Sequence, residues 1–241
     1  MKNNVYKRHL KFSSDHWWFD SRKIIIGHFL KKKIVKKIDI LDFGCGSGVN
    51  LKMLSKFGKV YYYDTNNVII RKIKKKFISN NFKYLKKFNL SKKKFDLIVA
   101  LDVIEHIKDE KKIIQILSQK LNKDGNILIT VPAYNFLFSS KDKDLHHKRR
   151  YTIKTIEKIL KKFFIIEKKT YFNFFLSILI IISILLFKIL SVKFIDKVER
   201  KPNFIMNFVF KKIFSFEKYF INFTNFPFGI SILIYAKKIN Q

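Results

Sequence analysis

The stretch Ile40-Leu41-Asp42-Phe43-Gly44-Cys45-Gly46-Ser47-Gly48 decides the fold that we expect, because an apolar segment runs directly into three glycines at alternate positions. Glycine takes positive φ without steric cost and lets the backbone approach a ligand closely. A helix that begins just after such a turn presents free N–H groups to the ligand. The stretch therefore predicts a strand, a turn that holds a nucleotide, and a helix.

An acidic residue ends the next predicted strand, residues 59–64, and two kinds of nucleotide site fit it. Asp64 lies where dinucleotide-binding folds hold ribose hydroxyls. Nicotinamide and flavin enzymes share this device, but their fingerprint is G-x-G-x-x-G. Here Gly44, Gly46 and Gly48 are evenly spaced, and Asp42 lies two positions before the first. This arrangement resembles the S-adenosylmethionine (SAM) motif of class I methyltransferases.

A second motif follows farther along the chain. Phe95 to Ala100 is apolar without polar alternation, which predicts a strand buried on both faces of a parallel sheet. The sequence Asp-Val-Ile-Glu-His in residues 102–106 resembles the fourth-strand motif of class I methyltransferases. Leu121 to Pro132 then reads as a helix end, a glycine turn and another buried strand, which matches the family's fifth strand. The resemblance implies a Rossmann-like α/β fold with a seven-stranded, mostly parallel sheet and an antiparallel last strand.

The resemblance also implies SAM as the cofactor and indicates which residues hold it. The sequence His-Trp-Trp-Phe-x-x-Arg in residues 16–22 is similar to a signature of a bacterial subgroup, in which this helix caps the cofactor pocket. Arg22 is then expected to hold the methionine carboxylate by a bidentate contact. Asn89 stands where relatives often carry an acidic residue that accepts from the adenine amino group, and its amide oxygen can still accept. The expected cofactor-binding residues are Arg22, Asp42, Gly44, Cys45, Gly46, Gly48, Asp64, Asn89 and Leu101.

The segment from Pro132 to Tyr151 is expected to be a long loop over the carboxyl edge of the sheet, where ligands bind in open α/β folds. Its pattern D-x-x-L-x-H-x-R-R-Y-T resembles the same bacterial subgroup, although His146 stands where glycine is usual. The implied reaction moves the sulfonium methyl of SAM to oxygen, nitrogen or carbon, and needs a base only if the acceptor must first lose a proton. His106 and His147 are the candidate catalytic bases, the alternative for each being a structural hydrogen-bonding role.

A metal-dependent variant of the site stays open. Asp102, Glu105 and His106 fall at i, i+3 and i+4, which would place them on one face of a helix, where they could share a divalent ion with His147. Related ubiquinone-pathway and small-RNA methyltransferases carry a Glu-x-x-Glu-His version of this cluster. The alternative is that the two carboxylates serve the turn and the helix N-terminus electrostatically. We assign no metal ligand from the sequence.

Composition limits the classes of partner. The chain has 241 residues and a single cysteine, Cys45, which excludes an intramolecular disulfide and indicates a reducing compartment. The formal net charge of +33 is compatible with nucleic-acid binding. The lysines, however, recur on almost every predicted helix instead of forming one stripe, a pattern that also fits lysine filling solvated faces by default. Of the two specific partners, we favour an anionic membrane surface over nucleic acid. No N-terminal signal peptide is expected, because charged residues interrupt the first apolar positions.

An apolar insertion is expected between the last two strands. No charge appears from Thr170 to Phe187, a length at the lower limit of a membrane span. A single crossing would separate two neighbouring strands of one sheet, so the chain must return. A second apolar stretch, Phe204 to Phe226, has four charges near one helical face, at Lys211, Lys212, Glu217 and Lys218. Interfacial helices therefore fit better than two spans, the alternative being a helical pair packed against the domain.

These observations predict one methyltransferase domain. It consists of a cap helix in residues 1–36, a SAM-binding core in 37–170, an apolar insertion in 171–228 and a last strand in 229–238. The leading functional hypothesis is a SAM-dependent methyltransferase on the cytoplasmic face of a membrane, with a small-molecule, lipid or lipid-linked acceptor. A methyltransferase of RNA or protein that uses the basic surface is the second hypothesis. A catalytically silent membrane-binding module with the same fold is the third.

Overall fold

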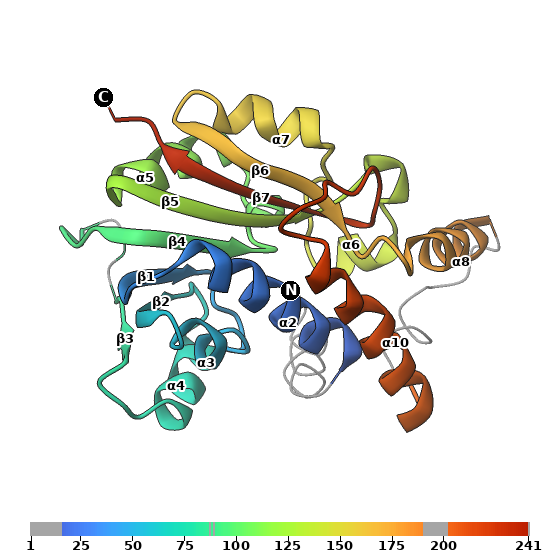
Figure 1. Cartoon of the computed structure of the whole chain (residues 1–241), viewed down its shortest axis with the longest axis horizontal. Coiled ribbons are helices and arrows are strands. Elements are labelled where there is room, and N and C mark those ends of the chain that lie inside the picture. The colour runs from blue at the N-terminus through green and yellow to red at the C-terminus, as the bar shows by residue number, and fades with distance from the viewer. Residues whose placement is uncertain (1–15, 87, 89, 190–201, 241) are drawn as a thin grey trace.

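The computed structural model describes residues 16–86, 88, 90–189 and 202–240. A single sheet of seven strands runs through its centre, in the order β3-β2-β1-β4-β5-β7-β6 (Figure 1). Only β7 is antiparallel to its neighbours, β5 and β6, which confirms the predicted sheet. The strands are β1 (Ile38–Phe43), β2 (Gly58–Tyr63), β3 (Phe82–Tyr84), β4 (Phe95–Leu101), β5 (Leu121–Pro132), β6 (Phe164–Phe172) and β7 (Ser231–Lys238).

The core lies where β1 and β4 pair in the middle of the sheet. Ile40 and Leu41 of β1 are fully buried, and so are Ile98, Val99 and Ala100 of β4. Adjacent residues point to opposite faces of a strand, so burial of consecutive side chains requires cover on both faces of the sheet. Helices supply that cover. They are α2 (Trp17–Lys33), α3 (Leu51–Leu54), α4 (Asn67–Lys76), α5 (Glu110–Gln119), α6 (Ser140–Asp144), α7 (Ile153–Leu160), α8 (Ser177–Ile189) and α10 (Phe204–Phe216), with short 3-10 turns η1 (Ile104–His106), η2 (Asn135–Leu137) and η3 (Glu217–Tyr219).

Three local expectations were wrong. The helix expected after the glycine turn is only the single turn α3, and Leu121, expected at a helix end, begins β5. Asp102 is not on a helical face with Glu105 and His106, because it has a φ of 56° and precedes the short turn η1. The cap of α2 is His16, whose Nδ1 accepts from the backbone N–H of Trp18. Ser14 and Asp15, whose side chains make them the caps to expect from the sequence, lie outside the described residues.

The insertion between β6 and β7 contains α8 and α10. Helix α10 lies against α2, where the hydroxyl of Ser21 donates to the carbonyl of Lys211 at 3.1 Å and Lys211 pairs with Asp20 at 2.7 Å. We expected Glu217 on a charged helical face, but it is fully buried in η3. Its carboxylate accepts the backbone N–H groups of Asn173, Phe174 and Phe175 at 2.6–3.2 Å. This acidic side chain therefore ties the chain before α8 to the end of α10.

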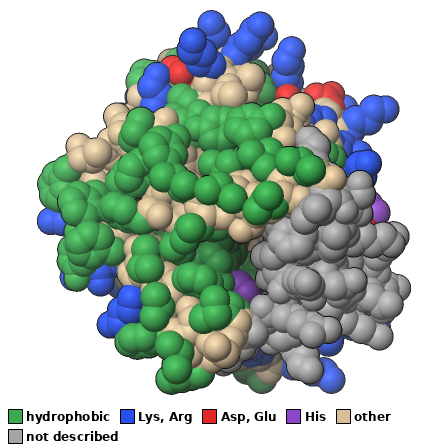
Figure 2. Space-filling model, turned by 90° about the vertical axis from the view of Figure 1, so that its right-hand side faces the viewer, with side chains coloured by type: hydrophobic (Ala, Val, Ile, Leu, Met, Phe, Trp, Pro, Cys, Tyr) green, Lys and Arg blue, Asp and Glu red, His purple; other side chains and the backbone are tan. Residues whose placement is uncertain are grey.

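The outer sides of α8 and α10 form one apolar face of the molecule. Figure 2 shows hydrophobic side chains over most of this side, with a hollow near its middle and Lys and Arg side chains around its rim. Ile189 of α8 is 77% exposed and Phe204 of α10 is 83% exposed. In the part of the chain that the structure describes, no helix has the length and apolarity to span a bilayer. We call these outer sides the apolar face; its exposed members include Ile178, Leu179, Ile182, Ile189, Phe204, Ile205, Phe208 and Val209.

Candidate active site

A cavity of about 1080 Å³ lies at the carboxyl edge of the sheet. Three neighbouring parallel strands each contribute the residue that follows their last one: Gly44 after β1, Asp64 after β2 and Asp102 after β4. The strand order reverses between β1 and β4, and such a switch point is where open α/β sheets bind ligands. The volume is at the upper end of ligand pockets, which hold about 300–1,000 Å³. The cavity therefore has room for a nucleotide and a second molecule.

The glycine turn forms one wall of this cavity. Gly46 has a φ of 51°, and a Cβ atom built there would meet nothing within 4 Å, so the absent side chain leaves open space beside the backbone. At Gly44, with a φ of 75°, a Cβ atom would lie 2.6 Å from Val103. The backbone N–H of Gly46 donates to Asp64 at 2.9 Å. The turn is therefore held by Asp64 and open to a ligand at Gly46.

Acidic groups behind the turn suit a ligand that brings hydrogen-bond donors. Asp42 is buried, and its Oδ2 has no hydrogen-bond partner among the described residues. Burial, with a smaller effect from Asp64, raises the pKa of Asp42 to about 7. An unpartnered carboxylate oxygen is costly unless a donor satisfies it. The open backbone at Gly46 and the carboxylate of Asp64, which lines the cavity, fit a nucleoside with hydroxyl donors, such as SAM.

Arg22 reaches the cavity from α2. Its Nη1 lies 2.5 Å from Asp102 Oδ2, and its Nη2 donates to the hydroxyl of Thr130 at 2.7 Å. The guanidinium also lies 5.6 Å from the ring centre of Trp18 and 5.2 Å from that of Phe172. These contacts fix Arg22 at the cavity wall. They also turn Asp102 toward Arg22 and Thr130, whose hydroxyl donates to Asp102 at 3.0 Å.

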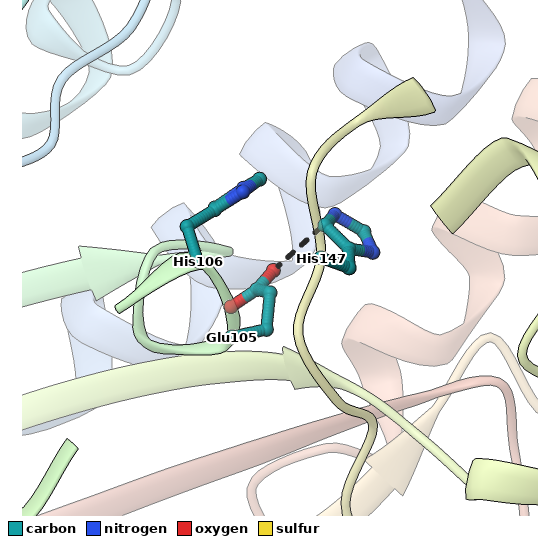
Figure 3. Close-up of side chains that lie close together, drawn as sticks. All are labelled: Glu105, His106 and His147. Carbon is teal, nitrogen blue, oxygen red and sulfur yellow. Dashed lines mark ion pairs between the residues drawn. The ribbon is translucent and has the colours of Figure 1, made fainter. Parts of the chain in front are cut away.

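A second cluster faces the cavity from η1 and from the loop after α6. Glu105, His106 and His147 each have one donor or acceptor atom within 4.8 Å of the others (Figure 3). The rings of His106 and His147 are 4.7 Å apart, and His147 Nε2 lies 4.0 Å from Glu105 Oε1. Glu105 is fully buried, and neither of its oxygens has a hydrogen-bond partner among the described residues. Of the four residues expected to share an ion, only these three gather, because Arg22 holds Asp102.

Burial changes the pKa values of His106 and Glu105 in this cluster. Burial, helped by the nearby His147, lowers the pKa of His106 to about 4, which makes its imidazole a weak base. Burial and the charge of Asp102 raise the pKa of Glu105 well above its usual value. Both effects favour uncharged side chains on this wall of the cavity at neutral pH.

His147 has an acidic partner to which sequence reasoning gave no role. Its Nδ1 lies 2.7 Å from Oδ1 of Asp142, a fully buried carboxylate in α6. Arg150 Nε and Nη2 donate to the same carboxylate at 2.9 and 3.0 Å. His146 has a φ of 60°, the left-handed conformation that glycine adopts most easily, so the chain turns here as the usual glycine would. The pattern Ser139-x-x-Asp142 is a capping-box signature, which indicates a helix that begins after Ser139 and has Asp142 in its first turn.

The other predicted site residues gather around the turn. Cys45 and Leu101 line the cavity with Gly44, Gly46 and Asp64, whereas Asp42 lies buried beneath. Burial raises the pKa of the Cys45 thiol far above its usual value, so this thiol stays protonated and is a poor nucleophile. Asn89 lies outside the described residues.

Comparison with known families decides the identity of this site. A family model described as a methyltransferase domain matches residues 21–163, which is more than half of the chain. The chain belongs to this methyltransferase family. The matched region includes the glycine turn, Asp64 and the Asp102–His106 segment. The methyltransferase is an enzyme that uses SAM as its methyl donor, as the resemblance of its motifs implied.

Relatives of the methyltransferase share its sequence at low identity. It is 28% identical to the ubiquinone biosynthesis O-methyltransferase of Pelagibacter ubique over 168 residues, which cover 56% of the chain and 70% of the relative. It is also 28% identical to the mitochondrial ubiquinone biosynthesis O-methyltransferase of Dictyostelium discoideum over 118 residues. That second match spans 42% of the chain and 37% of the relative, well under half of the Dictyostelium protein.

Solved structures share the fold. A methyltransferase from Bacillus halodurans superposes with a TM-score of 0.58 at 16% identity, covering 90% of this chain and 99% of the other. The N-methyltransferase NodS of Bradyrhizobium japonicum, solved with S-adenosylhomocysteine, has a TM-score of 0.55 at 14% identity, covering 69% and 88%. Both support the Rossmann-like architecture.

Proposed function

We propose that this methyltransferase works on the cytoplasmic surface of a membrane and methylates a lipid or lipid-linked acceptor. The observation that carries the proposal is the continuity between the cavity and the apolar face. Leu176, Ile180 and Ile184 line the cavity from α8 and the residue before it, and Met206 and Phe210 line it from α10. The same cavity has the glycine turn on its opposite side. An acceptor with an apolar tail can therefore rest between the two helices while its polar end lies near the methyl donor.

The exposed side chains outside the cavity favour a bilayer as the partner of this face. A contiguous apolar patch is costly in water and marks an interaction site. The chain carries a formal charge of +33, and Figure 2 shows Lys and Arg side chains at the rim of the face. Basic side chains beside an apolar patch suit an anionic membrane surface, to which each contributes about 1 kcal/mol. The same proposal includes the membership of this chain in the bacterial subgroup with an HWWF-type helix and an H-x-R-R-Y-T loop.

The site residues divide into those that hold the donor and those that face the acceptor. When bound, SAM supplies an activated sulfonium methyl group. The backbone of the turn at Gly44, Gly46 and Gly48 would approach SAM closely, and Asp64 would accept from its ribose. Arg22, or the Arg22–Asp102 pair, would face the methionine end of SAM, and Asn89 would face the adenine of SAM. His147 is the base that we assign, because the low pKa of His106 makes that residue a poorer proton acceptor.

Vesicle flotation tests the membrane part of the proposal. The full chain is mixed with vesicles of phosphatidylglycerol and phosphatidylcholine and centrifuged through a density gradient. Wild type should float, and the pair Ile182→Asp with Phe208→Asp, on the apolar face, should not. Val35→Asp with Ile78→Asp is the matched control, because those side chains are 95% and 85% exposed but belong to other parts of the molecule. Equal flotation of both double variants would contradict the proposal.

Two further outcomes distinguish the alternatives. Calorimetric titration with SAM should give one binding site, whereas a silent module need not bind it and a nicotinamide enzyme would bind NAD instead. Salt-sensitive binding of RNA that survives the two apolar-face substitutions would favour the RNA methyltransferase hypothesis, since phosphate contacts weaken steeply with salt.

A further inference from the structure

The carboxylate of Asp142 is held more firmly than any role in packing requires. It is fully buried and accepts from Arg150 through both oxygens and from the backbone N–H of Ser139 at 2.8 Å. It also accepts from the hydroxyl of Ser139 at 3.2 Å and lies 2.7 Å from His147 Nδ1. Burial alone would raise the pKa of Asp142, but the bonds from His147 and Arg150 outweigh it and hold that pKa well below the usual range. The carboxylate is thus ionised and acts only as an acceptor.

An acceptor-only partner determines which nitrogen of His147 carries the proton. Because Asp142 cannot donate, Nδ1 must carry the hydrogen and Nε2 keeps its lone pair. His147 lines the cavity, and the contact recorded for its Nε2, Glu105 Oε1, is 4.0 Å away and too long for a hydrogen bond. Among the described residues no hydrogen bond therefore occupies the nitrogen of His147 that can accept a proton.

We propose that Asp142, itself fixed by Arg150, is the positioning residue that makes His147 the general base for an acceptor hydroxyl, so that the methyltransferase forms methyl ethers. The inference rests on the proposed function for the location of the acceptor. The acceptor O–H proton moves to His147 Nε2, the oxygen lone pair forms the new O–CH3 bond, and the S–CH3 bond breaks with its electron pair left on sulfur. The imidazolium that forms is stabilised by Asp142, as in other carboxylate–histidine pairs.

Two features of the site favour an oxygen acceptor over nitrogen. A neutral amine already has a lone pair and loses its proton after transfer, so it needs no positioned base, whereas a hydroxyl gains nucleophilicity from deprotonation. Burial also favours the neutral form of Glu105, so that side chain offers no fixed negative charge to attract a cationic acceptor. The wall around His147 is therefore suited to an uncharged hydroxyl.

The tautomer of His147 can be measured without any acceptor or membrane. Long-range 1H–15N spectra of the 15N-histidine-labelled full chain, with His147→Gln for assignment, should show the Nδ1–H form in wild type. In Asp142→Asn the amide oxygen should keep the bonds from Ser139 and from Arg150 Nη2, which turns the amide NH2 toward His147 Nδ1 and Arg150 Nε and reverses the tautomer. Asp109→Asn is the control, because an asparagine cap at α5 is equivalent and should leave His147 unchanged.

Activity gives the second readout. With methyl-labelled SAM and a membrane lipid extract, Asp142→Asn should transfer methyl groups about 10²–10⁴-fold more slowly, with unchanged SAM affinity by calorimetry. The labelled product should resist alkaline hydrolysis, as an ether does and an ester does not. If the asparagine variant does not fold, the wild-type tautomer alone decides.

Several results would overturn the inference. These are an Nε2–H tautomer in wild type, an alkali-labile or N-methylated product, or equal transfer by wild type and Asp142→Asn. Stoichiometric Zn²⁺ or Mg²⁺ bound through His147 Nε2 would also overturn it, because that nitrogen would be occupied. Failure of the proposed function would give a different combination of results. The protein would then neither float with vesicles nor label lipid, while the tautomer of His147 would remain Nδ1–H.

Discussion

Two of the three glycines of the turn, Gly44 and Gly46, have different physical reasons to be glycine. A side chain at Gly44 would strike Val103, whereas one at Gly46 would enter the cavity without touching the described protein atoms within 4 Å. The even spacing was visible in the sequence and predicted the turn. The sequence could not show which glycine faces the ligand, because that depends on how Val103, far along the chain, packs against Gly44.

Substitution of Gly46 by arginine should separate binding from folding. The new side chain would occupy the space of the donor, and the left-handed backbone would cost about 1–2 kcal/mol, so the protein should fold but lose SAM affinity at least 100-fold. Calorimetry and thermal unfolding measure the two effects. Gly58→Ala is the contrasting variant, because its Cβ would lie 1.8 Å from the carbonyl of Ile38. Gly58→Ala should therefore lose thermal stability, and not SAM affinity, as its main effect. Full SAM affinity in Gly46→Arg would remove the turn from the donor site.

Asp142 should make stability depend on pH in a defined direction. Its pKa is lowered in the folded state, so it stabilises the fold above the unfolded pKa of about 3.9, and that stabilisation is lost as pH falls toward the folded pKa. Asp142→Asn should therefore cost about 3 kcal/mol near pH 6.5. Urea unfolding should show this difference shrinking below about pH 4. A difference that stays constant from pH 6.5 to pH 3 would contradict the assignment of a buried ion pair to Asp142.

At the scale of elements, hydrophobic pattern predicted the strands better than the helices. The runs at β1 and β4 are apolar because both faces are covered, and that signal needs no knowledge of distant contacts. The helix after the glycine turn was overestimated, since only the turn Leu51–Leu54 is helical before the chain enters β2. The position of Glu217 was also predicted wrongly. Its partners are backbone N–H groups of residues 173–175, and no local pattern reports such a contact.

Glu217 should control how firmly α8 is attached. Glu217→Gln leaves one acceptor oxygen for three N–H groups and turns an amide NH2 toward them, so we expect a loss of about 1–3 kcal/mol. Hydrogen exchange should accelerate in residues 173–186 while β1 and β4 stay protected. Glu157→Gln, which breaks an exposed pair with Lys169, is the control and should change stability by less than about 1 kcal/mol. Similar exchange at residues 173–186 in both variants would argue against the anchor.

At the scale of the whole molecule, charge and the apolar face should act together on membrane binding. Composition revealed the charge, and the sequence revealed two apolar stretches. It could not show that the helices of both stretches line the cavity that contains the glycine turn, because this depends on the packing of α10 against α2.

Raising the salt concentration should weaken vesicle binding only in part. Screening shortens the reach of exposed charges from about 10 Å at 0.1 M to about 3 Å at 1 M, but it leaves apolar burial intact. Flotation with anionic vesicles should therefore fall between 0.05 and 0.5 M NaCl without disappearing. Complete release at 0.5 M NaCl would point to charge alone, and the apolar face would then have no role.

The most direct test of the account is methyl transfer itself. The full chain is incubated with methyl-labelled SAM and a membrane lipid extract in vesicles, beside Gly46→Arg and the apolar-face pair Ile182→Asp with Phe208→Asp. We predict label in the lipid phase with wild type, none with Gly46→Arg, and a strong reduction with the apolar-face pair despite normal SAM binding. Label confined to RNA or protein, or lipid labelling that the apolar-face pair leaves unchanged, would contradict a methyltransferase that takes its acceptor from the membrane.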